Sequence, residues 1–277
     1  MGQLVMRCFS FLLVLLVLLG NGCRGTGKVM PVKVEEVLQP LQKIELNSEI
    51  VGICADGNRV LMLDNSGTRV LRFDSSFATV ETIPLGIRLT APRGIYADRY
   101  YIYVYDDNTL YRLAKDKLVM SAWFNNVRIE GLAGFSPGEM LVIDGDRQVV
   151  WLKSLFGESR PFLDRTEIAK PKGMAVFADG IFGVLAGTGW LLKVNRAGIV
   201  TESLSVPTGI DLITADKKGR VLVMRRGEPV LFVIADKTIQ GYEVQDALNP
   251  MALAVTGDRF VILDGGRRIL LYALPGK

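Results

Sequence analysis

The chain has 277 residues, of which 49% are hydrophobic and 22% are charged, and its formal net charge is +4. That length and apolar content allow one large all-β or α/β domain, or two small ones, and argue against wholesale disorder. The charge is too small and too evenly spread to indicate nucleic-acid binding. The sequence contains no histidine, which excludes His-based acid–base catalysis, Ser-His-Asp and Cys-His nucleophile pairs, and His-ligated metal sites.

A short apolar run opens the chain. Arg7 precedes it, and it extends over 12 residues from Cys8 to Leu19. This is the length of a signal-peptide core, whereas a membrane-spanning helix needs about 20 residues. Small residues then lead to Cys23. The segment resembles a bacterial lipoprotein signal, although Gly20 stands where that family usually has leucine.

This resemblance implies that residues 1–22 are a signal peptide and that the Cys23 thiol carries diacylglycerol, a palmitate-type anchor. Residues 23–32 then form a flexible tether, and several acyl chains hold the protein stably on a membrane. Because Arg24 rather than aspartate follows the cysteine, we expect an extracytoplasmic location on the outer rather than the inner membrane. An ordinary secretory signal with a chance cysteine, or an uncleaved anchor, are the alternatives.

A repeat of about forty residues fills the rest of the chain, residues 33–277, which we interpret as a single domain. Each unit begins with a small residue and an apolar pair, and four strand-like runs separated by Gly, Asn and Asp turns make up the unit. Six anchors begin the units: Gly52, Gly94, Gly131, Gly173, Gly209 and Ala252. Four strands at this period are typical of a propeller blade.

The sequence therefore predicts an all-β, six-bladed β-propeller with four antiparallel strands per blade. The chain ends after three strands of the sixth blade, so a strand from residues 33–46 is expected to complete that blade, and Val34–Leu38 and Ile44–Leu46 both have a strand pattern. Five or seven blades, or another all-β repeat, remain alternatives.

The repeat resembles that of NHL-type β-propellers. The closest match is the run DNSGTRVLRFD from Asp64 to Asp74, and Pro92–Ile95 and Pro207–Ile210 match the opening of the NHL unit. The resemblance covers the whole chain after the tether and implies the propeller fold.

Candidate binding residues lie where the inner strands begin, which is the usual binding face of a propeller. The residue before each anchor forms a ring of mixed character: Val51, Arg93, Glu130, Lys172, Thr208 and Met251. Two cations beside one acid would compete with a metal ion, so the ring predicts ion pairing or a weak anion site, and no metal or other cofactor is expected.

A second set comprises residues at the ends of strands. Four units keep an aspartate there, namely Asp64, Asp106, Asp144 and Asp264, whereas Ala186 and Arg225 replace it in units four and five. These carboxylates either bind cations or sugar hydroxyls or, as we favour, accept N–H bonds in the following turn. Arg225, Arg226 and Arg267 lie on equivalent turns and form either a basic patch or simply solvated turns.

The favoured function is a non-catalytic lipoprotein whose propeller is a protein-binding scaffold in the cell envelope, with a protein partner, a lipid-mediated membrane contact and no nucleic acid. One alternative is a carboxylate- or metal-dependent hydrolase or lyase of the lactonase kind, using Glu49, Glu130 or Asp211. Another is an envelope carbohydrate binder with exposed aromatic residues. Cys54 lies in an apolar strand pattern and is interpreted as a buried small hydrophobe.

Overall fold

A computed structural model describes residues 32–276, apart from Lys33, Ser75, Thr79, Leu118, Phe156, Gly157, Arg165, Ala178 and Asp179. The predictions for the signal peptide and for Cys23 lie outside these residues. The described part of the chain forms 25 strands and no helix, so none of its segments is a helix suited to crossing a membrane.

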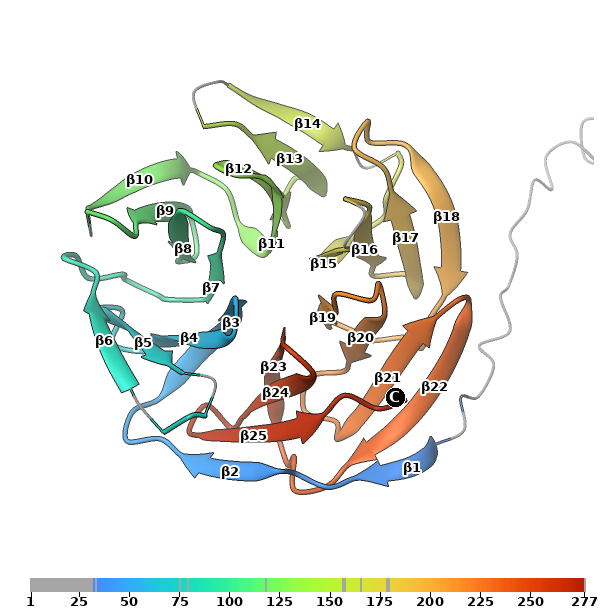
Figure 1. Cartoon of the computed structure of the whole chain (residues 1–277). Coiled ribbons are helices and arrows are strands. Elements are labelled where there is room, and N and C mark those ends of the chain that lie inside the picture. Colours follow the sequence, from blue (N-terminus) through green and yellow to red (C-terminus); the bar gives the residue numbers. More distant parts are fainter. Residues whose placement is uncertain are drawn as a thin grey trace, which may run out of the picture. The chain divides into compact units, whose positions relative to one another are not determined.

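The strands form six sheets arranged in a ring, which confirms the prediction of a six-bladed β-propeller (Figure 1). Blades one to three consist of β3 (Ile50–Asp56), β4 (Arg59–Asp64), β5 (Arg69–Phe73) and β6 (Val80–Pro84); β7 (Gly94–Ala97), β8 (Tyr101–Tyr105), β9 (Thr109–Ala114) and β10 (Met120–Asn125); and β11 (Ile129–Ser136), β12 (Glu139–Asp144), β13 (Val149–Lys153) and β14 (Ser159–Leu163). Blades four to six consist of β15 (Pro171–Val176), β16 (Phe182–Ala186), β17 (Trp190–Val194) and β18 (Val200–Ser205); β19 (Leu212–Ala215), β20 (Val221–Met224), β21 (Val230–Ala235) and β22 (Thr238–Val244); and β23 (Pro250–Thr256), β24 (Arg259–Asp264) and β25 (Arg268–Ala273).

The inner strands approach one another closely where they begin. A side chain at Gly52 would place its Cβ 3.0 Å from the Cα of Gly94 in the next blade, which is too near for any residue larger than glycine without a shift of the backbone. This approach explains why a small residue recurs at the start of most units. In four blades the residue before it is the extra residue of a β-bulge: Val51, Glu130, Lys172 and Met251.

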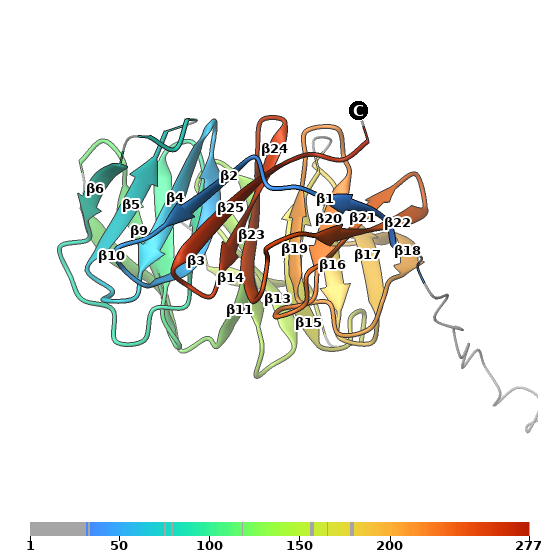
Figure 2. The same cartoon turned by 90° about the horizontal axis from the view of Figure 1, so that it is seen from below.

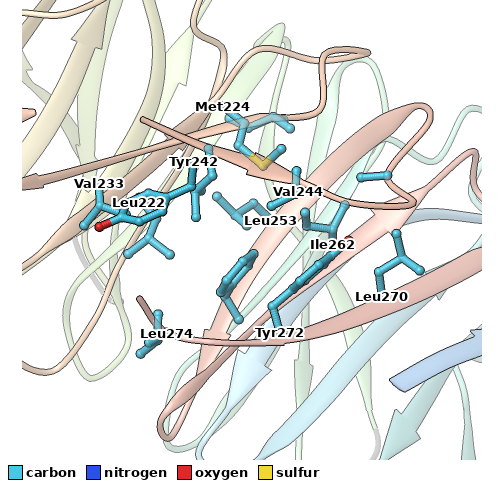
Figure 3. Close-up of a cluster of buried hydrophobic side chains, with 14 residues drawn as sticks. Leu222, Met224, Val233, Tyr242, Val244, Leu253, Ile262, Leu270, Tyr272 and Leu274 are labelled. Atoms are coloured by element: carbon cyan, nitrogen blue, oxygen red, sulfur yellow. The ribbon is translucent and has the colours of Figure 1, made fainter. Parts of the chain in front are cut away.

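The core lies between the blades, because the second strand of each sheet is buried on both faces. Between blades five and six, 14 side chains form one buried cluster (Figure 3). In it Tyr272 stacks on Phe260, with ring centroids 4.9 Å apart, and its hydroxyl donates to the carbonyl oxygen of Gln245 at 2.6 Å. A buried phenol needs such an acceptor, and this bond ties blade six to the loop after β22.

The N-terminal segment closes the ring, as predicted, and also extends a neighbouring blade. β2 (Gln42–Glu45) pairs antiparallel with β25 and supplies the outer strand of blade six. β1 (Val34–Leu38) pairs parallel with β22, so blade five has five strands. Figure 2 shows the two strands following one another along the outer edges of the two blades. Pro40, which lacks an N–H, lies between them.

Candidate functional site

We call the face of the propeller that carries the starts of the inner strands, together with the turns between second and third strands, the entry face. Behind it the inner strands surround a channel with a cavity of about 160 Å³ near the entry face and another of about 290 Å³ beyond it. Six apolar side chains, one from each inner strand, line both cavities and so form the boundary between them: Ile53, Ile95, Leu132, Met174, Ile213 and Leu253. The interior of the channel is therefore apolar at its waist.

A charged cavity of about 280 Å³ lies at the mouth of this channel, and we call it the basin. Its polar lining comprises four cations, three carboxylates and a phenol: Arg93, Arg128, Lys172, Arg226, Asp107, Glu130, Asp211 and Tyr105. The structure thus brings together four of the candidate binding residues predicted from the sequence, namely Arg93, Glu130, Lys172 and Arg226.

The bulges of the inner strands explain why these side chains reach the basin. A bulged residue has no partner in the ladder, and the local kink turns its side chain away from the alternation of the strand. Glu130 and Lys172 are the extra residues of such bulges. Arg93 and Asp211 hold the equivalent position in blades two and five. Each directly precedes the first residue of its inner strand that pairs with the second strand, which is Gly94 in blade two and Leu212 in blade five.

Each carboxylate of the basin is paired with an arginine. Arg93 Nε lies 2.5 Å from Asp107 Oδ1, and Arg128 Nη2 lies 3.1 Å from Glu130 Oε1. Arg226 Nε lies 3.5 Å from Asp211 Oδ2. These pairs are wholly or partly exposed, so each contributes no more than about 1 kcal/mol to stability.

Lys172 differs from the three paired arginines. Its side chain is exposed, and no carboxylate of a described residue lies within ion-pair distance of its ammonium group. The basin therefore has one cation more than its carboxylates match.

Tyr105 forms part of the floor of the basin. Other blades carry an aliphatic residue or methionine at its position, such as Leu63 in blade one. Burial raises the pKa of the Tyr105 hydroxyl to about 12; Arg226 and Arg93 oppose this effect, and Glu130 adds to it. The hydroxyl is therefore neutral at physiological pH and can donate a hydrogen bond into the basin.

The sequence-based position of the fifth anchor was wrong. In the structure β19 begins at Leu212, and Gly209 lies in the preceding loop with a φ of 80°. Asp211, rather than Thr208, therefore joins the ring. Pro207–Ile210 matches the opening of an NHL unit but lies too early: Gly209 precedes Arg225 by 16 positions, whereas Gly52 precedes Asp64 by 12. That difference in spacing is a signal that could have placed the anchor correctly.

The four strand-end aspartates are buried, and those of blades one to three accept N–H groups of the turns that follow them. Asp64 Oδ1 accepts the N–H of Ser66 at 2.8 Å, and its Oδ2 accepts from the guanidinium of Arg69. Asp106 and Asp144 accept the corresponding N–H groups of their turns. Asp264 accepts from Asn249 N–H and from Arg268. Each of the four carboxylates therefore has hydrogen-bond partners within the protein.

The other two arginines predicted as candidate binding residues, Arg225 and Arg267, lie outside the basin. The guanidinium of Arg225 donates to the carbonyl oxygen of Thr208 and, at 2.6 and 2.7 Å, to the two carboxylate oxygens of Glu228, so it holds its own turn. Arg267 is exposed in the turn between β24 and β25 and does not line the basin.

Three residues of the basin were missed in the sequence: Tyr105, Asp107 and Arg128. Tyr105 stands at a position where the other blades carry an aliphatic residue or methionine, and this departure is a signal in the repeat. Asp107 and Arg128 lie in loops whose sequences differ from blade to blade, and only the fold places them beside Arg93 and Glu130.

Within the described ranges, no group of three or more His, Cys, Asp or Glu side chains could hold a metal ion. No family model and no curated protein matches the sequence.

Solved structures with the same architecture exist at low sequence identity. A virginiamycin B lyase from Staphylococcus aureus is 14% identical, with a TM-score of 0.61 over 85% of this chain and 89% of that one; a variant of this lyase in which alanine replaces one histidine is described as catalytically inactive. The calcium-binding protein regucalcin from Agrobacterium tumefaciens is 13% identical, with a TM-score of 0.61 over 88% and 98% of the two chains. A chain of a nidogen–laminin complex is 16% identical, with a TM-score of 0.62 over 75% and 85%. At these identities the likeness shows the fold alone, a six-bladed β-propeller with structural neighbours of the NHL, regucalcin and virginiamycin B lyase type.

Proposed function

We propose that this protein is a non-catalytic lipoprotein, anchored through Cys23 to the outer membrane of a bacterium, whose propeller binds another protein of the cell envelope. The basin on the entry face is the docking site, and an acidic surface of the partner meets it. The observation that carries the proposal is the unmatched ammonium group of Lys172 in a basin whose carboxylates all have arginine partners.

The charges of the basin support this assignment. Four cations and three carboxylates give the lining a net charge of +1. A concave surface of one net sign attracts an oppositely charged partner and speeds its association. The neutral hydroxyl of Tyr105 adds a hydrogen-bond donor, which suits a carboxylate or carbonyl acceptor.

Two observations favour binding over catalysis. The structurally similar lyase loses its activity when one histidine is replaced, and this chain has no histidine at all. The structural neighbours also include a propeller found in a nidogen–laminin complex, so protein binding is a use that this fold supports.

The docking claim is tested by capture from membranes with the full-length lipidated protein. Chemical cross-linking is followed by identification of the partner and by direct titration of that partner against each variant. Lys172→Glu is expected to weaken binding by about tenfold or more, which corresponds to about 1.4 kcal/mol, and added salt is expected to weaken binding to the wild type.

Lys218→Glu is the matched control. Lys218 is an exposed lysine in the turn between β19 and β20, on the face opposite the basin. The Lys218→Glu variant should bind the partner as the wild type does. Equal losses for the two variants, or capture that recovers only the bait, would contradict the proposal.

The anchor is tested separately by mass spectrometry of the N-terminal peptide. Cys23 is expected to carry diacylglycerol at its thiol, and Cys23→Ala is expected to release the protein from the membrane fraction. An unmodified Cys23 in membrane-bound protein would contradict lipidation.

A further inference from the structure

Blade four lacks a carboxylate that four of the other blades carry. Asp64, Asp144 and Asp264 end the second strands of their blades, Asp106 follows directly after the second strand of blade two, and Ala186 ends the second strand of blade four. In blades one to three the aspartate accepts the N–H two residues further on, at 2.8 to 3.1 Å. The equivalent group in blade four is the N–H of Thr188, two residues after Ala186.

The turn after Ala186 keeps the backbone geometry of a turn built around aspartate. In blade one, Gly67 N–H donates to Asp64 O at 2.9 Å and Asn65 N–H donates to Glu49 O at 2.8 Å. In blade four, Gly189 N–H donates to Ala186 O at 3.1 Å and Gly187 N–H donates to Lys170 O at 2.8 Å. Only the bond to the carboxylate is missing, and the Thr188 N–H, which corresponds to that of Ser66, has no acceptor among the described residues.

A pocket of about 110 Å³ lies beside this turn, between blade four and the loop that leads to blade five. It is lined by Ala186, Gly187 and Gly189 on one side and by Pro207 and Gly209 on the other. Thr188 is exposed and lies in the turn between two lining residues, but it does not itself line the pocket. Since one water molecule occupies about 30 Å³ of the liquid, the pocket has room for roughly three or four waters, or for one short acidic group.

Lys172 supplies the charge at this pocket. It lines both the pocket and the basin, and its Cε lies 3.7 Å from where a Cβ of Gly187 would be, so its stem runs along the turn. Asp211 also lines the pocket, but its Oδ1 accepts the Arg226 N–H at 2.8 Å and its Oδ2 lies near the guanidinium of Arg226. The negative charge of Asp211 is thus matched, whereas the positive charge of Lys172 is not.

We propose that this pocket binds a carboxylate of the partner, which takes the place of the aspartate that blade four lacks. One carboxylate oxygen accepts the Thr188 N–H, as Asp64 accepts the Ser66 N–H, and the other faces the ammonium group of Lys172. The inference rests on the proposed function, which it deepens by naming the group recognised. That group is either an acidic side chain or the C-terminal carboxylate of a chain.

The proposal is tested by NMR titration of the mature full-length protein in detergent with small probes. N-acetyl-aspartate N-methylamide represents an acidic side chain, N-acetylglycine represents a chain terminus, and N-acetyl-asparagine N-methylamide is the neutral control. The probe of the true source is expected to shift the amide resonances of Thr188 and Gly189, and the neutral control is not. Inorganic phosphate that binds more tightly than either acid would overturn the assignment to a carboxylate.

Two variants sharpen the test. Ala186→Asp restores the carboxylate that the repeat uses elsewhere, so it should fold with an unchanged or higher melting temperature and weaken probe binding by at least about tenfold. Lys172→Met should weaken binding to a similar degree, whereas Lys218→Met on the opposite face should not. No shift with the wild type, or undiminished binding to a folded Ala186→Asp protein, would overturn the proposal.

Failure here differs from failure of the proposed function. If the partner binds the wild type and Ala186→Asp equally but not Lys172→Glu, the basin is the docking site and the pocket plays no part. If the probes bind and no partner is captured, the pocket binds carboxylates and the docking role is wrong.

Discussion

The hydroxyl of Tyr105 occupies the space that a side chain at Gly94 would fill: a Cβ built on Gly94 would lie 2.3 Å from that oxygen. Tyr105 ends the second strand of blade two, and Gly94 begins its inner strand. The phenol therefore crosses over the inner strand to reach the basin, and it can do so only because Gly94 has no side chain.

This relationship predicts that Gly94→Ala destabilises the protein by about 1–3 kcal/mol, the usual cost of overpacking a closely packed site. Replacing the phenol with the aliphatic residue of another blade should relieve the clash, so Gly94→Ala should cost less in a Tyr105→Leu background. Urea unfolding of the two single variants and the double variant measures this coupling. Strictly additive changes would show that the ring does not occupy this space.

The lowered pKa of the Asp64 carboxyl predicts that its contribution to the stability of the protein depends on pH. Burial raises the pKa of this carboxyl, but hydrogen bonds from Ser66, Ser48 and Arg69 outweigh burial and lower the pKa from 3.8 to about 2. A lowered pKa in the folded state contributes stability that is complete above the unfolded value and is lost as the pH falls through the folded value. The shift corresponds to about 2 kcal/mol at neutral pH.

Asp64→Asn should therefore be less stable than the wild type by about this amount at pH 7, and by about half as much at pH 3. The measurement is the free energy of unfolding in urea at both values of pH. Asp107→Asn, which removes an exposed carboxylate on the same face, is the control and should change stability little. A difference between wild type and Asp64→Asn that stays constant with pH would contradict the role assigned to the carboxylate.

The blade count and nearly all strands could be predicted from the sequence because they depend on local properties. Each apolar strand is long enough to be recognised, and turns rich in Gly, Asn and Asp recur with the period of a blade. The inner-strand glycines could be predicted as a repeat, but their cause, the approach of Gly52 to Gly94, is visible only in three dimensions.

The rest of the site depends on contacts between segments far apart in the sequence. The strand pattern of Val34–Leu38 does not specify a partner, and the edge it joins, that of β22, is set by the closed ring. Likewise Asp107 becomes part of the basin because it forms an ion pair with Arg93 of the same blade. Blade five was misaligned because a proline–glycine motif resembled the start of a unit more closely than the true start did.

Cys54 should be unreactive in the folded protein. Its thiol is buried, and burial raises its pKa well above the ordinary value; the carboxylate of Asp56 adds to this effect and Lys115 opposes it. Because the thiolate is the reactive form, iodoacetamide should label the Cys54 peptide only after unfolding. Peptide mapping by mass spectrometry checks this, and rapid labelling at pH 8 without denaturant would show that the strand opens readily.

The ring closure predicts unequal effects for two substitutions in the N-terminal segment. Ile44 pairs with Ile269 and packs against the buried cluster between blades six and one, whereas Val37 on β1 is 46% exposed. Ile44→Asp should therefore cost about 2 kcal/mol or more, because it removes apolar burial and places a charge at the edge of the core.

Val37→Asp, the matched change on the neighbouring strand, should stay within about 0.5 kcal/mol of the wild type. Hydrogen exchange gives a second readout, since opening of β2 should expose the Leu271 carbonyl that accepts the Leu41 N–H and speed exchange of that amide. Faster exchange of Leu41 in Ile44→Asp, with unchanged exchange in blade three, would place the opening at the seam. Equal destabilisation by the two substitutions would mean that β1 contributes as much as β2 to holding the ring closed.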